Sequence, residues 1–441
     1  MQEGARIVTT ESNDPICILG GGVSGLFFCY YSGREAVLFE KEDRLGGLAR
    51  SFDTQGVTCD IGPHIFFSRN QEILDFVTSL TPMHKLKRSN RILYKDRFIK
   101  YPFENELSAL PEADRDWCLQ TFLDNPYVGY KADDMLSFFY KTFGEGITRA
   151  YLEPYNRKIW KFEPAFMDTQ MVERIPKPPR EDIIASAAGE ATEGYLHQLY
   201  FKYPDKGGTQ SMIQTIADRC GARLTTNLSS AVEKVRCLPD GTFEIQAGGQ
   251  SQVFPELVTT IPIHELMTII EPAPPEKIRA AVDALRFNSI HITIVNVAND
   301  RLGDNFAVMV PHPDISFHRL SKIDFLGDKY NLPDSSTLMV EITYQAGGQY
   351  DLPATQISEL VVEDLVRAKL TDRGGVHSAV TRSFQYAYVI YDLHHRRNID
   401  LALAWLESLR IRSVGRFATF EYINMDQAVL RAKLAAEQEF V

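Results

Sequence analysis

Residues 15–25 have the sequence Pro-Ile-Cys-Ile-Leu-Gly-Gly-Gly-Val-Ser-Gly, and this stretch decides the fold. The short apolar run 15–19, bounded by a polar segment and by glycine, is typical of a buried parallel strand. The apolar and aromatic residues 26–32 predict a helix packed on a sheet, and residues 35–40 predict a second strand. A strand, a helix and a strand in this order form a βαβ unit that begins at residue 15.

The glycines between the first strand and the helix have the spacing of a dinucleotide-binding turn, Gly20-x-Gly22-x-x-Gly25. Gly20 permits a tight turn, Gly22 lets a pyrophosphate approach the backbone, and Gly25 lets the helix pack closely on the strand. Val23 and Ser24 stand at the expected helix N-terminus, where free N–H groups face the phosphates. These five residues are therefore predicted to bind a dinucleotide cofactor.

The composition limits the class of protein. At roughly 100–200 residues per domain, 441 residues correspond to two to four structural units. Hydrophobic residues make up 44% of the chain and charged residues 24%, so a sizeable core is available and general disorder is excluded. The net charge of −11 argues against a general nucleic-acid binder but leaves room for a local basic pocket.

The six cysteines are scattered, with no CxxC pair and no Cys/His cluster at metal-ligand spacing. We therefore expect neither a disulfide framework nor a metal site. Residues 1–14 lack the features of a signal peptide, and no apolar run approaches the ~18 residues that cross a bilayer. The sequence predicts a soluble cytoplasmic protein without a membrane or nucleic-acid partner. It leaves the oligomeric state open, a homodimer included.

The second strand continues into a segment that indicates which dinucleotide is bound. Glu40 follows Gly20 by twenty residues, where a carboxylate accepts hydrogen bonds from a ribose. The run Glu40-x-x-x-Arg44-Leu45-Gly46-Gly47 resembles the FAD-binding signature of the glutathione-reductase and amine-oxidase superfamilies. The resemblance implies FAD, with Arg44 at a phosphate and the glycine doublet close to the flavin. The same predicted cofactor-binding set includes Lys41, Leu48 and Val232, the last as a backbone partner of the adenine.

The remaining pattern predicts an α/β fold with three interwoven parts. They are a Rossmann-like FAD-binding domain (1–85, 200–270 and 395–441), an inserted helical substrate domain (105–199) and an antiparallel or mixed sheet domain (271–394). Three prolines and an alanine-rich stretch predict a mobile loop at 176–194, with room for a short helix. A hairpin is expected over 87–101, and one strand over 252–260.

Further segments resemble the UDP-galactopyranose mutases, in the order of that family. They are Gly62-Pro63-His64-Ile65-Phe66, Pro154–Trp160, Val172–Pro176, Tyr203–Gln210 and Gly415–Asp426. The resemblance implies that His64 and Arg174 are the catalytic residues, His64 over the flavin and Arg174 on a pyrophosphate. It implies flavin contacts for Pro63, His64, Ile65, Gly415, Arg416, Asn424 and Met425. It implies substrate contacts for Tyr155, Trp160, Arg174, Tyr195, Asn288 and Tyr422.

The implied activity is that of a flavin-dependent mutase that interconverts the pyranose and furanose forms of a nucleotide-linked sugar similar to UDP-galactose. In that family reduced FAD attacks the anomeric carbon through N5, the sugar is held as a flavin adduct, and no net redox change results. The alternative is a FAD-dependent oxidase or desaturase of the amine-oxidase or protoporphyrinogen-oxidase type, which shares the segment from Gly20 to Gly47. A third hypothesis is a flavoprotein scaffold without activity.

Three departures from the mutase pattern concern the substrate rather than the cofactor. Asn288 stands where the family has a second phosphate-binding arginine, and losing such a charge-assisted contact costs ~1.5–3 kcal/mol. Asn424 stands where the family usually has aspartate, and the segment 176–194 is longer and richer in alanine.

Overall fold

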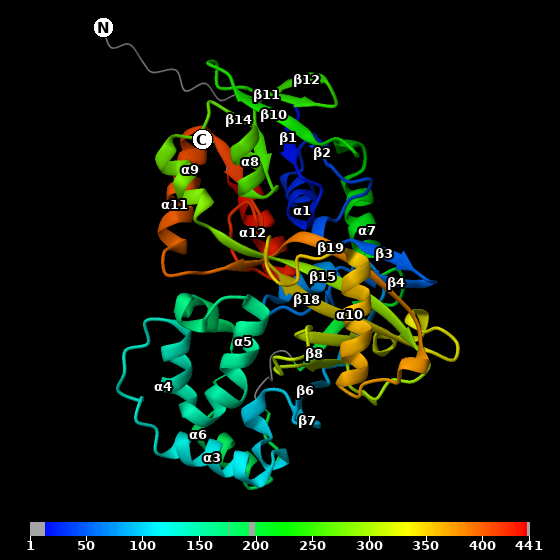
Figure 1. Cartoon of the computed structure of the whole chain (residues 1–441). Helices are drawn as coiled ribbons and strands as arrows, with labels where there is room; N and C mark the ends of the chain where they lie inside the picture. The colour runs from blue at the N-terminus through cyan, green and yellow to red at the C-terminus, as the bar shows by residue number, and fades with distance from the viewer. Residues whose placement is uncertain (1–13, 176, 194–198, 439–441) are drawn as a thin grey trace.

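A computed structural model describes residues 14–175, 177–193 and 199–438 of the chain. A parallel sheet with helices on both faces, a long second sheet and a helical part meet at a common centre (Figure 1). The expected α/β architecture, with a Rossmann-like domain, a helical part and a second, mixed sheet, is confirmed. The residue boundaries of the three domains stay a prediction.

The first sheet has five parallel strands in the order β20-β13-β1-β2-β9. They are β1 (Ile16–Leu19), β2 (Ala36–Phe39), β9 (Leu224–Asn227), β13 (Leu257–Thr259) and β20 (Ile411–Ser413). In the central strand, Leu19 lies opposite Phe39 on one side and Thr259 on the other. Because all five strands run the same way, their carboxyl ends share one edge, and the glycine-rich turn lies there.

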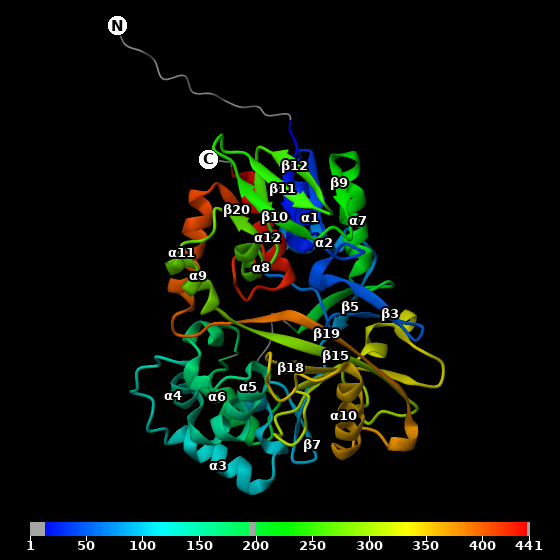
Figure 2. The same cartoon turned by 45° about the horizontal axis from the view of Figure 1, so that its top comes forward.

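Helices cover both faces of this sheet (Figure 2). On one face lie α1 (Val23–Ser32), α2 (Gln71–Thr78), α7 (Gln210–Cys220) and α12 (Met425–Glu437). On the other lie α8 (Ile263–Ile269), α9 (Glu276–Asp283), α11 (His395–Ser408) and a four-stranded sheet in the order β12-β11-β10-β14. Its strands are β10 (Val232–Cys237), β11 (Phe243–Ala247), β12 (Gln250–Phe254) and β14 (Ile270–Glu271).

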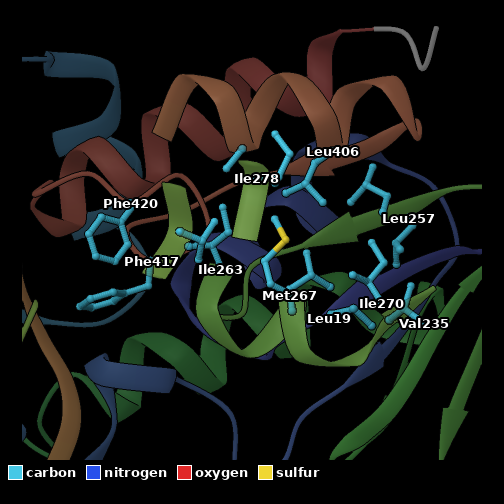
Figure 3. Close-up of a cluster of buried hydrophobic side chains, with 14 of the residues drawn as sticks. Leu19, Val235, Leu257, Ile263, Met267, Ile270, Ile278, Leu406, Phe417 and Phe420 are labelled. Carbon is cyan, nitrogen blue, oxygen red and sulfur yellow. The ribbon is translucent and has the colours of Figure 1, made fainter. Parts of the chain in front are cut away.

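Figure 3 shows the core between the first sheet and the helices of this second face. Leu19 and Leu257 from the sheet meet Ile263 of α8 and Leu406 of α11, and all four side chains are almost fully buried. This apolar layer packs tightly against one face of the first sheet and holds it rigid. The carboxyl edge of the sheet can therefore hold a ligand in a fixed position.

The single strand expected over residues 252–260 is wrong: the structure splits it between two sheets. Residues up to Phe254 belong to the antiparallel strand β12, and residues from Leu257 onward belong to the parallel strand β13. Pro255 stands between them. Since proline has no backbone N–H, it cannot continue a ladder, and the chain leaves one sheet for the other at this residue.

The second sheet has seven strands in the order β19-β15-β18-β17-β16-β6-β7. They are β6 (Asn90–Tyr94), β7 (Arg97–Lys100), β15 (Arg286–Val297), β16 (Ala307–Met309), β17 (Arg319–Lys322), β18 (Ser336–Tyr344) and β19 (Val376–Ile390), with α10 (Ala354–Arg367) packed on one face. All pairs are antiparallel except β16 with β6. The expected hairpin over 87–101 is therefore confirmed, and it extends this sheet.

The helical part contains α3 (Glu112–Leu123), α4 (Met135–Ile147), the π-helix η4 (Thr148–Leu152), α5 (Glu153–Trp160) and α6 (Arg180–Ala187). Asp134 caps α4 by accepting a hydrogen bond from the Ser137 amide at 2.7 Å. Helix α6 lies inside the segment predicted as a mobile loop, whose mobility stays a prediction. No helix in the described ranges has the length and apolar character needed to cross a bilayer.

Short strands join these parts. They are the antiparallel pairs β3 (Ser51–Thr54) with β4 (Val57–Asp60), and β5 (Met83–Lys87) with β8 (Tyr200–Pro204). Asp60, at the end of β4, accepts hydrogen bonds from the Ser51 hydroxyl at 2.6 Å, the Tyr203 hydroxyl at 2.8 Å and the Thr209 amide at 3.1 Å. The buried carboxylate thus joins β3, β8 and the start of α7, just before the Gly-Pro-His segment.

Candidate functional site

The glycine-rich turn is tied to the end of β2 by backbone amides. The Gly21 amide donates to Glu40 Oε2 at 2.8 Å, and the Glu42 amide donates to Oε1 at 3.0 Å. The Gly46 amide donates to the Gly21 carbonyl at 2.8 Å. The Glu40 carboxylate is thereby fixed at the carboxyl end of β2, beside the turn, as the sequence predicted. We call residues 20–25, 40 and 46–47 the cradle.

Two glycines of the cradle are required for different physical reasons. A Cβ on Gly25 would lie 2.3 Å from the Gly20 carbonyl oxygen, so this glycine is needed for the chain itself to pack. A Cβ on Gly22 would meet only the Gly47 Cα, at 3.8 Å, which is ordinary contact. Gly22 has φ −76°, which any residue adopts. The space at Gly22 is therefore not needed by the described protein and fits a ligand.

The N-terminus of α1 fits a pyrophosphate. Within the described residues, no side chain caps this helix end, and its first turn holds no acidic residue. The amides of the first turn, at Val23 and Ser24, thus keep hydrogen-bonding capacity toward an anion. Together with the Glu40 carboxylate for a ribose, these groups match the charges of an adenine dinucleotide such as FAD.

The C-terminal stretch of the chain closes over the same helix end. Gly415 has φ +106°, and a Cβ there would lie 2.6 Å from Ser24 Oγ. Arg416 follows, and its guanidinium donates to the Ile423 carbonyl at 2.9 Å and the Ala387 carbonyl at 3.1 Å. These bonds hold the stretch that leads to α12 against β19, and they bring residues 415–425 to the cradle.

Three other predicted cofactor residues lie around the cradle. Lys41 forms an ion pair with Glu265 at 2.9 Å. The Arg44 side chain is half exposed and pairs with the neighbouring Asp43 at 3.2 Å, so its predicted phosphate contact stays a prediction. Val232 begins β10 two residues after Ser230, whose amide donates to the Glu40 carbonyl.

A cavity of about 850 Å³ lies where the three parts meet. Ten of the residues predicted from the sequence line it: Leu48, Pro63, His64, Ile65, Tyr155, Trp160, Arg416, Tyr422, Asn424 and Met425. They come from four separate segments of the chain. The lining includes the Gly62–Ile65 turn with residues 424–425, where the resemblance places the flavin, and the aromatic side chains of α5.

His64 is held as a neutral imidazole at the cavity wall. Burial, with the positive charges of Arg416 and Arg319, lowers the pKa of His64 to about 4, although the Gly62 carbonyl acts in the opposite direction. At neutral pH the ring is therefore a hydrogen-bonding group rather than a cation, and it adds no charge to the cavity.

Aromatic side chains from three segments form another part of the lining, which we call the aromatic wall. The Trp160 ring meets the Tyr388 and Tyr422 rings edge to face, each with centroids 5.7 Å apart. Trp160 Nε1 donates to Asn156 Oδ1 at 2.8 Å, one helical turn earlier. Tyr155 stacks on Tyr151 at 5.3 Å. Trp160 and Tyr422 are thus brought together, and the wall can stack on a planar ring. Their predicted substrate contacts stay predictions.

Asn288, predicted as a substrate contact, does not line the cavity. It is fully buried, and its Nδ2 donates to the Ile159 carbonyl at 3.1 Å and to the Trp160 carbonyl at 2.7 Å. The amide therefore satisfies the last carbonyls of α5 and fixes the helix end that carries Trp160. The predicted substrate contact of Asn288 depended on its position in the family pattern. That pattern does not show that the amide binds the end of α5.

Two predicted substrate residues fall at the limits of the description. Tyr195 lies outside the described residues. The backbone of Arg174 ends the 3₁₀ helix η6 (Thr169–Arg174), but its side chain lies outside the description. Its neighbours Met171 and Ile175 line the cavity. The roles predicted for Arg174 and Tyr195 stay predictions.

Sequence reasoning missed an ion pair in the cavity wall. Arg319 Nε and Nη2 donate to Glu341 Oε1 and Oε2 at 2.6 and 2.7 Å, and both residues line the cavity. Burial lowers the pKa of Arg319, but the Glu341 carboxylate together with Tyr388 and Tyr155 outweighs it, and the pKa is raised well above the usual value. Glu341 is the single charged residue of the otherwise uncharged strand β18, and this signal does not reveal its partner in β17.

Comparison with known proteins agrees with this architecture. Residues 18–80 match the NAD(P)-binding Rossmann-like domain family. The fold is similar to that of reduced UDP-galactopyranose mutase, with a TM-score of 0.87 and 24% identity over 96% of this chain and 95% of that one. It is also similar to a protein from Exiguobacterium sp. 255-15 named as a protoporphyrinogen oxidase (TM-score 0.75, 16% identity, 97% and 98% covered). A putrescine oxidase is similar too (TM-score 0.67, 13% identity, 96% and 98% covered). At these identities the likeness concerns the fold, which a mutase and oxidases share.

Proposed function

We propose that the protein is a flavin-dependent mutase that interconverts the pyranose and furanose forms of a nucleotide-linked sugar similar to UDP-galactose, with FAD in its reduced form. The observation that carries the proposal is the composition of the 850 Å³ cavity. It extends from the Gly62–Ile65 turn to the aromatic wall of Trp160 and Tyr422, so one ligand can contact both.

The charge of the cavity supports an anionic small-molecule substrate. Its described lining holds five cationic side chains and two carboxylates, although the whole chain carries −11. The cations are Arg69, Arg88, Lys177, Arg319 and Arg416, and the carboxylates belong to Glu341 and Asp426. A local basic lining in an acidic protein attracts an anion such as a nucleotide.

FAD, when bound in reduced form, supplies a nucleophilic nitrogen for the anomeric carbon of the sugar. The chain supplies binding and orientation: the cradle holds the dinucleotide, the neutral imidazole of His64 offers a hydrogen bond beside the Gly62–Ile65 turn, and Trp160 can stack on a base. The aromatic wall also leaves less of the cavity surface to water, which protects a reactive sugar from hydrolysis.

Anaerobic turnover tests the proposal. Dithionite-reduced protein should convert UDP-galactofuranose into UDP-galactopyranose, separated by ion-pair chromatography, while the oxidised protein should not. Trp160→Phe should lower kcat/KM about tenfold because it removes an indole from the wall. Trp405→Phe is the matched control, since Trp405 lies on α11 against a different core and should leave turnover unchanged. Equal turnover by oxidised protein, or none by either form with any of a panel of nucleotide sugars, would contradict the proposal.

An oxidase or desaturase is the second candidate, because Asn288 leaves the cavity without the second arginine of the mutase pattern. Oxygen uptake with small amines or cyclic alkenes tests it. Uptake that depends on these substrates, combined with no sugar conversion, would favour the oxidase.

A further inference from the structure

Arg319 and Glu341 form a cross-strand pair in the second sheet. They lie directly opposite each other in the ladder between β17 and β18. Both oxygens of the carboxylate are engaged, with N–O distances of 2.6 and 2.7 Å. Glu341 is fully buried, and the Arg319 side chain is 26% exposed. The geometry is a side-on fork, so the guanidinium is rigidly held and its remaining N–H groups are directed elsewhere.

The pair adjoins both the Gly62–Ile65 turn and the tyrosines of the aromatic wall. A Cβ on Gly62 would come within 3.9 Å of Glu341 Oε2, so the carboxylate adjoins the turn that carries His64. Both side chains also lie near the Tyr155 and Tyr388 hydroxyls of the aromatic wall. The charge of Arg319 lowers the pKa of each tyrosine, and the charge of Glu341 raises it. A ligand that reaches from the turn to the wall therefore passes this pair.

The pair offers hydrogen bonds without net charge. A guanidinium has five N–H groups, and this fork uses two of them, so up to three can still donate to a phosphate oxygen. The carboxylate cancels the positive charge at the same place. Among the four other described cations of the lining, Arg416 donates to two backbone carbonyls, and Arg88 is half-buried with its guanidinium over the Phe67 ring. Arg69 and Lys177 are exposed. Asn288 contributes no charge.

We propose that Glu341 is a specificity-determining residue that makes this phosphate anchor charge-neutral. The inference rests on the proposed function and deepens it, because it concerns the phosphates of the nucleotide-linked sugar. An anchor without net charge binds phosphate oxygens through hydrogen bonds alone. Its affinity for the ligand therefore gains little from the charge of a second phosphate. The substrate class therefore extends to sugars linked through a single phosphate, which carry one negative charge less than diphosphate-linked sugars.

Binding of inorganic pyrophosphate to the FAD-loaded protein tests this, because the probe needs no base or sugar. In calorimetric titrations the wild type should bind pyrophosphate and orthophosphate with affinities within about threefold. Glu341→Gln should bind pyrophosphate about tenfold more tightly or better, since it releases the charge of Arg319. Glu256→Gln is the charge-matched control: Glu256 pairs with Arg34 at 2.6 Å, lies outside the described lining, and should change nothing.

A double variant keeps the test decisive if Glu341→Gln is poorly folded. Arg319→Gln with Glu341→Gln removes both charges and most of the N–H donors together, so binding of pyrophosphate and binding of orthophosphate should weaken by the same factor, within about threefold. A loss at least tenfold larger for pyrophosphate than for orthophosphate would overturn the inference, because Arg319 would then act as a charged clamp in the wild type. An unchanged affinity in Glu341→Gln would overturn it too. These binding measurements do not depend on turnover of a sugar. A failure of the mutase proposal would appear only in the turnover assay and is therefore distinguishable from a failure of this inference.

Discussion

The cradle around Gly20–Gly25 and the cavity wall around Arg319 differ in the groups that face a ligand. The cradle offers backbone amides and empty space, and its parts lie within residues 20–47 of the chain. The wall offers side chains from β17, β18 and α5, which lie up to 186 residues apart in sequence (341 − 155), and its charges are already paired with one another. A backbone site depends on glycine spacing, whereas a side-chain site depends on which strands become neighbours.

The largest expected effect separates the two glycines of the cradle. Gly22→Ala should keep the fold and lose about 100-fold or more in FAD affinity, because the methyl group occupies the approach of the pyrophosphate and removes charge-assisted hydrogen bonds. Gly25→Ala should fail to fold stably, since its methyl group would lie 2.3 Å from a backbone oxygen. Flavin absorbance of the purified proteins and circular dichroism distinguish the two. Normal flavin content in Gly22→Ala would contradict the prediction that the cradle binds the pyrophosphate of FAD.

The next effect concerns the ion pair of the wall. Arg319→Met should destabilise the protein by about 3–5 kcal/mol because it leaves the Glu341 carboxylate buried without a partner. Arg319→Met with Glu341→Leu should recover most of that loss, since no charge is then buried. Unfolding in denaturant measures both. If the double variant is as unstable as the sum of the single variants, the two side chains do not act as a pair.

A smaller effect is expected at Asn288, which supports the wall from behind. Asn288→Ala should cost about 1–3 kcal/mol and shift the fluorescence of Trp160, because it removes the Asn288 donor from the Trp160 carbonyl and leaves the Ile159 carbonyl with the Thr343 hydroxyl. Asn296→Ala is the matched control on the same strand: its hydrogen bonds go to Gln55 and Thr337, away from α5. An equal fluorescence shift in both variants would argue against the role of Asn288.

The smallest expected effect is a pH dependence from His64. Its pKa is about 4 in the folded state and 6.5 ordinarily, so the unfolded state binds more protons between these values. The contribution of His64 to stability is complete above pH 6.5 and is lost as the pH falls through 4. Asp60, whose pKa burial raises to about 6 from 3.8, acts in the opposite direction. The difference in unfolding free energy between His64→Asn and the wild type, measured against pH, isolates the contribution of His64. A difference that does not change from pH 4 to 6.5 would contradict the lowered pKa of His64.

Local sequence predicted the cradle well. Three glycines at fixed spacing, a strand before them and a carboxylate after the next strand are all contained in about 30 residues, so the backbone geometry follows from the order of residue types. Residues such as Pro63, His64, Trp160 and Tyr422 were found only because short motifs resemble a known family, and the structure places each of them on one cavity.

Other features were not accessible from the sequence. The change from one sheet to the other at Pro255 was not predicted, since the apolar pattern continues on both sides of this proline. The parallel pairing of β6 with β16 joins segments about 200 residues apart, and no local signal specifies such a partner. Asn288 looked like a missing phosphate ligand, yet its neighbour in space is the end of α5.

The sequence by itself determined the βαβ unit, the cradle and the kinds of side chain available to the cavity, because these depend on local periodicity and on where glycine permits close approach. Only the tertiary structure decided which of those side chains face the cavity and what charge they present. Arg319 stands in the sequence as a cation, but the register of β17 and β18 places Glu341 opposite it and cancels its charge. Electrostatics in a buried site depend on distances between side chains, and strand pairing sets those distances.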